Sequence, residues 1–256
     1  MHEPGENSGT FAVNGVDLCV DIKGDGEPLV LLHGGGGASQ NWSLIFEAPP
    51  PGFCTIAPDL RGHGRSTNPS GAFSIRQCAF DVLALLDGLD VDRFKAIGVS
   101  LGAKTLLHVA TMQPARVEAM VIASATPYFP PQARSAMAQL TVESRTPQEW
   151  SQMRAWHVHG DAQIEAVWRA MRGLKDSYTD MNFTPPLLAT ITARTLIVHG
   201  DRDPLYPVEL ALEMYRAIPS AALWVVPNGG HGPIFGSQAP AFATAAIDYV
   251  SGSQRA

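Results

Sequence analysis

The 256-residue chain has the composition of a globular protein: 45% of its residues are hydrophobic, 16% are charged, and its formal net charge is -6 at pH 7. This balance disfavours nucleic acid or an anionic membrane as the main partner, because both attract clustered lysine and arginine. No apolar stretch approaches the length of a membrane span, and the polar start is not typical of a signal peptide. The odd number of cysteines, three, favours reduced thiols. We therefore expect a cytoplasmic protein that acts on a small molecule, and a homo-oligomer is left open.

The predicted elements begin with two strand-like runs, residues 10–13 and 16–22, which flank an Asn-Gly pair typical of a hairpin turn. Buried apolar runs and helical patterns then alternate. The further strands are expected at residues 28–32, 53–57, 94–99, 117–123, 195–198 and 222–226. The helices between and after them are expected at residues 74–89, 101–112, 208–217 and 239–250. This order predicts an α/β fold with a mostly parallel central sheet, an antiparallel N-terminal hairpin and helices on both faces.

Residues 127–190 interrupt the alternation, because no buried strand run falls within them. Their patterns predict helices at 132–140, 147–157 and 162–174, with tryptophan and methionine concentrated there. We expect a helical lid over the carboxyl edge of the sheet, where ligands bind in such folds. A second helical layer packed elsewhere is the alternative. The predicted organisation is a core in two parts, residues 1–126 and 191–256, interrupted by a lid, residues 127–190.

A serine between two glycines marks the change from a strand pattern to a helix pattern at residues 98–102, Gly-Val-Ser-Leu-Gly. This arrangement is typical of a sharp turn that exposes a nucleophilic hydroxyl, here that of Ser100. Such a serine needs a base to take its proton and a carboxylate to orient that base. Asp201 and Asp203 follow the expected strand 195–198, and His231 follows the strand 222–226. The order Ser100, Asp203, His231 is the one expected for this arrangement.

The chain resembles members of the α/β-hydrolase superfamily over nearly its whole length. Residues 33–37 (His-Gly-Gly-Gly-Gly) match an H-G-x-x-G loop, residues 59–66 match D-x-x-G-x-G-x-S, and residues 200–207 match G-[DE]-x-D-x-x-x-P. The serine turn and a glycine-flanked histidine complete five motifs in order. The resemblance implies that Ser100 is the nucleophile and that His231 is its base, with no cofactor and no metal.

Two aspartates compete for the role of the orienting acid. The family pattern puts the acid four residues before Pro207, which favours Asp203 and leaves Asp201 to cap the turn. No aspartate or glutamate follows the expected strand 117–123, where some relatives keep an alternative acid.

The oxyanion of the reaction needs backbone N–H donors. We expect one from Leu101, at the start of the helix after the serine, where the helix dipole helps. The other is expected from Gly35, with Gly36 as the nearest competitor.

The substrate pocket is harder to predict. Its candidate residues are Gly36, Trp42, Trp150, Trp156 and Phe235, although aromatic side chains are more often ordinary core. A lid rich in Trp, Met and Pro suggests a mostly apolar substrate. The sequence places no arginine or lysine in the pocket to bind an acid.

Four other histidines are assigned structural or surface positions. His33 and His63 are expected to brace their loops. His157 and His159 could suggest a metal site, but alternate residues of a helix do not share a face, so both are expected on the lid surface.

Ester or lactone hydrolysis through an acyl-enzyme is the expected function. A serine at the turn disfavours haloalkane dehalogenase and epoxide hydrolase activity, because similar proteins with those activities use an aspartate there. Carbon–carbon bond hydrolysis of a vinylogous diketone is an alternative, weakened because Gly232 and not tryptophan follows His231. Perhydrolysis resembling that of cofactor-free haloperoxidases, and ligand binding without catalysis, are the remaining alternatives.

Overall fold

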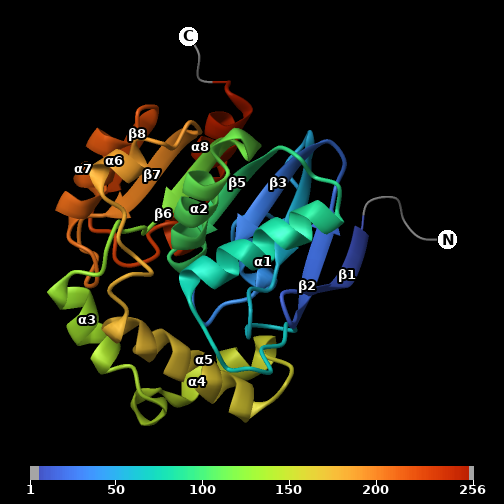
Figure 1. Ribbon diagram of the computed structural model, residues 1–256, viewed down its shortest axis with the longest axis vertical. Coiled ribbons are helices and arrows are strands. Elements are labelled where there is room, and N and C mark those ends of the chain that lie inside the picture. The colour runs from blue at the N-terminus through green and yellow to red at the C-terminus, as the bar shows by residue number, and fades with distance from the viewer. Residues whose placement is uncertain (1–5, 254–256) are drawn as a thin grey trace.

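The computed structural model describes residues 6–253. An eight-stranded sheet lies at the centre of this part of the chain (Figure 1). In spatial order its strands are β1 (Glu6–Val13), β2 (Val16–Lys23), β4 (Phe53–Pro58), β3 (Glu27–Leu32), β5 (Phe94–Val99), β6 (Val117–Ala123), β7 (Arg194–Gly200) and β8 (Ala221–Val226). β1 and β2 form an antiparallel hairpin, β2 is antiparallel to β4, and all later pairs are parallel. The predicted fold class is confirmed.

The local sequence explains the turns that begin the main elements. Asn14 and Gly15 adopt positive φ angles of 46° and 77°, as a two-residue hairpin turn requires. Ser74 caps α1 (Ile75–Gly88), because its hydroxyl oxygen accepts a hydrogen bond of 3.0 Å from the backbone N–H of Gln77.

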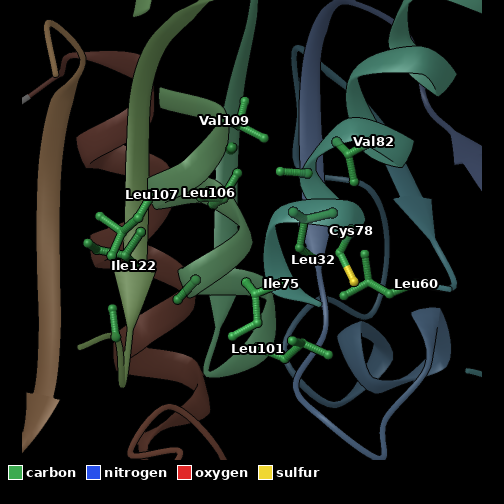
Figure 2. Close-up of a cluster of buried hydrophobic side chains, with 14 of the residues drawn as sticks. Leu32, Leu60, Ile75, Cys78, Val82, Leu101, Leu106, Leu107, Val109 and Ile122 are labelled. Atoms are coloured by element: carbon green, nitrogen blue, oxygen red, sulfur yellow. The ribbon is translucent and has the colours of Figure 1, made fainter. Parts of the chain in front are cut away.

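Two hydrophobic layers enclose the sheet. Successive residues of β3 point to opposite faces, so Val30 and Leu32 enter one layer while Leu29 and Leu31 enter the other. The first layer packs against α1, α2 (Leu101–Met112) and α7 (Val208–Ala217), and Figure 2 shows the part contributed by α1, α2, β3 and β6. The second packs against α8 (Ala239–Ser251) on the opposite face.

The segment 127–190 contains helices and no named strand. α3 (Pro131–Ala138), α4 (Pro147–Trp156) and α5 (Asp161–Gly173) lie together beyond one end of the strands (Figure 1). The shorter α6 (Pro185–Leu188) packs instead against α7. At the base of the segment, Tyr128 and Asn182 form an isolated antiparallel bridge, and the N–H of Phe183 donates to the Pro127 carbonyl at 2.9 Å.

Short 3₁₀ helices complete the described chain: η1 (Ser39–Leu44), η2 (Pro114–Arg116), η3 (Val142–Ser144), η4 (Leu174–Asp176) and η5 (Gly236–Gln238). Among residues 6–253, no helix has both the length and the apolar character needed to cross a bilayer.

Candidate active site

Ser100 occupies a strained turn between β5 and α2. Its φ of 51° and ψ of −104° lie in a region that non-glycine residues rarely adopt. Hydrogen bonds on both sides hold this conformation: the Ser100 N–H donates to the Ala123 carbonyl of β6 at 2.8 Å, and the Ser100 carbonyl accepts from the Lys104 N–H at 3.0 Å. The turn thus presents the hydroxyl at the carboxyl end of the central strands.

The two glycines of the turn are required by close backbone contacts. A Cβ atom on Gly102 would lie 2.1 Å from the carbonyl oxygen of Leu32, at the end of β3. A Cβ atom on Gly98 would lie 2.7 Å from the carbonyl carbon of Gly102. The Gly102 N–H also donates to the His33 carbonyl at 3.0 Å. The start of α2 therefore packs directly on the neighbouring strands, which a side chain at either position would prevent.

The structure brings Ser100, His231 and Asp203 into one hydrogen-bonded chain. His231 Nδ1 lies 2.9 Å from Asp203 Oδ2, and His231 Nε2 lies 2.8 Å from Ser100 Oγ. An ionised carboxylate only accepts, so Nδ1 carries the proton and Nε2 is free to accept from the serine hydroxyl. This is the tautomer that a base for Ser100 needs.

Asp203, and not Asp201, orients the histidine. Burial opposes ionisation of the Asp203 carboxyl, but hydrogen bonds from His231 and from the backbone N–H groups of Leu205 (2.8 Å) and Tyr206 (3.2 Å) hold its pKa below the usual range. Asp201 is exposed, and no described residue hydrogen-bonds to its side chain. The expectation that Asp201 caps the turn is wrong, since Asp203 itself accepts the turn's N–H groups.

The glycine loop after β3 faces the serine. His33 is fully buried below this loop, where Nδ1 donates to the Gly34 carbonyl at 2.7 Å and Nε2 accepts from the Leu60 N–H at 2.9 Å. Leu101 is the first residue of α2, so its N–H has no partner within the helix. In the described part of the chain, no hydrogen bond occupies the N–H of Leu101 or Gly35. Both residues line the same cavity as Ser100.

A cavity of about 460 Å³ lies between these loops and the helices of segment 127–190. Ser100 and His231 line this cavity on the side of the sheet. Most of its wall is apolar, and the side chains from α3 to α5 that line it include Ala136, Met137, Met153, Trp156, Trp168 and Met171.

Three of the five predicted pocket residues line this cavity: Gly36, Trp156 and Phe235. Trp42 does not, because it is buried in the layer on the α8 face and stacks on Phe46. Trp150 does not line it either. This half-buried residue of α4 packs against the hydrophobic layer, and the Arg154 guanidinium lies 5.1 Å from the centroid of its ring.

Sequence reasoning missed Lys104, which lines the cavity with Ser100. The sequence alone placed no lysine or arginine in the pocket to bind an acid, whereas the structure places Lys104 there. Lys104 is only 4% exposed, and its Nζ donates to Tyr206 Oη at 2.8 Å. The signal was present, because a residue four positions after Ser100 lies on the same face of α2.

His157 and His159 form no metal site with other described residues. His157 is buried, with Nδ1 donating to the Met153 carbonyl at 3.0 Å, so its predicted surface position is wrong. His159 is exposed, and its Nε2 lies 3.0 Å from the carbonyl oxygen of Arg65. Within residues 6–253, no three His, Cys, Asp or Glu side chains are grouped in a way that could hold a metal ion.

The fold agrees with comparison to known proteins. A model of the alpha/beta hydrolase family matches residues 29–246. The chain belongs to this family.

Three individual relatives share between 17% and 34% sequence identity with the chain. The chain is 26% identical over 248 residues to a pimeloyl-[acyl-carrier protein] methyl ester esterase of Nitrosomonas europaea, covering 84% of this chain and 93% of that protein. It is 34% identical over 113 residues to an uncharacterized protein of Mycobacterium tuberculosis, a match of 44% of this chain and only 33% of the relative's length. Among solved structures, an alpha/beta hydrolase from a Medee basin deep-sea metagenome library has a TM-score of 0.80 at 17% identity, covering 95% of this chain and 97% of that one.

Proposed function

We propose that the protein is a serine hydrolase that cleaves carboxylic esters or lactones through an acyl-enzyme. The observation that carries this proposal is the hydrogen-bonded chain from Ser100 through His231 to Asp203 at the floor of a largely apolar cavity. The esterase named among the relatives supports ester chemistry. No cofactor is needed for this reaction.

In the proposed mechanism, Ser100 Oγ attacks the substrate carbonyl carbon while its proton passes to His231 Nε2. The carbonyl oxygen becomes an oxyanion and accepts hydrogen bonds from the N–H groups of Leu101 and Gly35. His231 then gives its proton to the departing alkoxide, which leaves as the alcohol. A water molecule, deprotonated by His231, attacks the acyl-enzyme, and the acid leaves as Ser100 regains its proton. Asp203 stays ionised throughout and stabilises the imidazolium.

Segment 127–190 has the role of a lid in this proposal. Its side chains from α3, α4 and α5 form the cavity wall opposite Ser100. An apolar wall of this kind excludes bulk water, which strengthens the hydrogen bonds to the oxyanion.

A fluorophosphonate probe tests the proposed nucleophile. We expect one covalent adduct by intact-mass measurement on the wild-type protein and none on Ser100→Ala. An adduct that persists in Ser100→Ala, or the absence of any adduct on the wild type, would contradict the proposal and favour a ligand-binding protein.

Substrate panels then separate the alternative reactions. p-Nitrophenyl esters of graded chain length are assayed beside lactones, a vinylogous diketone, and an ester with peroxide as acceptor. Turnover of esters or lactones above the other substrates is expected. A clear preference for the diketone would replace ester hydrolysis by carbon–carbon bond hydrolysis.

A further inference from the structure

Lys104 places a positive group in a cavity that is otherwise mostly apolar. Its Nζ lies 5.3 Å from the ring centroid of Phe129 and 5.1 Å from that of Tyr206, and it donates one hydrogen bond, to Tyr206 Oη. An ammonium has three N–H donors. Among the described residues, no carboxylate lies within ion-pair distance of Nζ, so none of them forms a salt bridge with it.

Among the described residues that line the cavity, Glu149 alone carries a carboxylate, and its hydrogen bonds are already made within the protein. Glu149 accepts hydrogen bonds from the backbone N–H of Thr146 at 2.7 Å and from Arg145 at 2.9 Å. It closes the N-terminal turn of α4 and is paired with its own cation.

An isolated ammonium in such surroundings is costly. Burial lowers the pKa of Lys104 to about 7, and the more distant charges of Asp203 and Asp180 oppose this only in part. A buried cation regains stability when an anion and its hydrogen bonds are supplied together. Lys104 lines the cavity, so a molecule bound there could supply both.

We propose that Lys104 binds a carboxylate group of the substrate, so that the protein's substrates are esters or lactones that also carry a free carboxylate. The ester or lactone chemistry in this inference rests on the proposed function, whereas carboxylate binding at Lys104 does not. Lys104 and Ser100 line the same cavity, so one bound molecule can present a carboxylate to the first and an ester carbonyl to the second. Half-esters of short dicarboxylic acids have this form.

A purely positioning role for Lys104 is the competing explanation. Its hydrogen bond holds Tyr206, whose ring meets that of His231 edge-on with centroids 5.4 Å apart. Loss of that contact would lower turnover of every substrate alike. A carboxylate site, in contrast, changes the preference between charged and neutral substrates.

The test compares monomethyl adipate with its neutral counterpart, in which a primary amide replaces the carboxylate, in a pH-stat assay. Lys104→Gln removes the charge but keeps an N–H donor for the Tyr206 hydroxyl. Lys175→Gln is the matched control, because Lys175 pairs with Asp176 outside the cavity and carries the same charge.

We expect the wild type to favour the charged ester by about 10- to 100-fold in kcat/KM, the range set by one charged hydrogen-bonded pair. Lys104→Gln should bring this ratio close to unity, while Lys175→Gln should keep the wild-type ratio. An equal loss for both esters in Lys104→Gln, with the ratio unchanged, would overturn the inference and leave the positioning role.

A binding measurement separates this inference from the proposed reaction. Calorimetry with adipate on Ser100→Ala and on Ser100→Ala/Lys104→Gln needs no turnover. Affinity that falls at least about tenfold in the double variant supports the carboxylate site even if fluorophosphonate labelling fails. Equal affinity in both variants refutes the site even if Ser100 is labelled and esters are hydrolysed.

Discussion

Replacing Gly102 by alanine should destabilise the protein strongly. The new methyl group would lie 2.1 Å from the Leu32 carbonyl oxygen and 2.5 Å from its carbonyl carbon, well inside any ordinary contact. Both atoms belong to the backbone of β3, which is paired on both sides, with Leu32 opposite Gly98 of β5. Relief therefore requires a backbone shift in the centre of the sheet, which costs about 3 kcal/mol.

Gly173→Ala provides the matched control, because the same substitution is made near the end of another helix. Gly173 has helical φ and ψ of −61° and −25°, and nothing lies within 4 Å of its added Cβ. Alanine there should raise the free energy of unfolding by about 0.5–1 kcal/mol.

Urea denaturation followed by circular dichroism measures both changes. We expect the midpoint to fall by about 1 M in Gly102→Ala and to rise slightly in Gly173→Ala. If the two variants shifted in the same direction by similar amounts, close packing of α2 on β3 could not be the reason for a glycine at position 102.

Three further predictions concern individual side chains. Asp203→Asn should lower kcat at least about a thousandfold and Asp201→Asn should have little effect in ester assays, and the reverse ranking would move the acid role to Asp201. Lys104→Met should raise the free energy of unfolding more at pH 6 than at pH 10, by about 2–4 kcal/mol in urea titrations. The reason is that the penalty on the buried ammonium is complete below its folded pKa of about 7 and disappears as the pH approaches the unfolded value of 10.5; equal gains at both pH values would contradict it. Burial raises the pKa of the Cys78 thiol, so mass spectrometry should find it unmodified by Ellman's reagent until the protein is unfolded, and labelling in the native state would show an accessible thiol.

The parts of the fold that the sequence predicts well depend on local patterns. The strands at 94–99 and 117–123 lie where their apolar runs indicated, and the helix 101–112 begins directly after the serine turn. The convergence of Ser100, Asp203 and His231 was also predictable, because each follows a parallel strand and such strands end at the same edge of the sheet.

The errors arise where distant parts of the chain decide the outcome. β1 begins at Glu6 and not at residue 10, because β2 extends to Lys23 and offers it a backbone partner whatever its side chain. The number of tryptophans in the sequence does not indicate which ring lines a cavity. Trp42 packs in the hydrophobic layer on the α8 face of the sheet. His157 is a polar residue that is buried by packing between elements, which no single helical pattern reveals.

The helical segment above the cavity leaves and rejoins the core at neighbouring points, where Phe183 bonds back to Pro127. Ser100 precedes the segment, and the aspartate and histidine bonded in line with it follow it. Because closure entropy grows only with the logarithm of loop length, segments of other lengths can span the same two anchor points at little cost. The segment can thus be replaced by one of another length without moving the two points at which it joins the core. A different segment between these anchor points would change the cavity wall and leave the hydrogen bonds of Ser100, His231 and Asp203 in place.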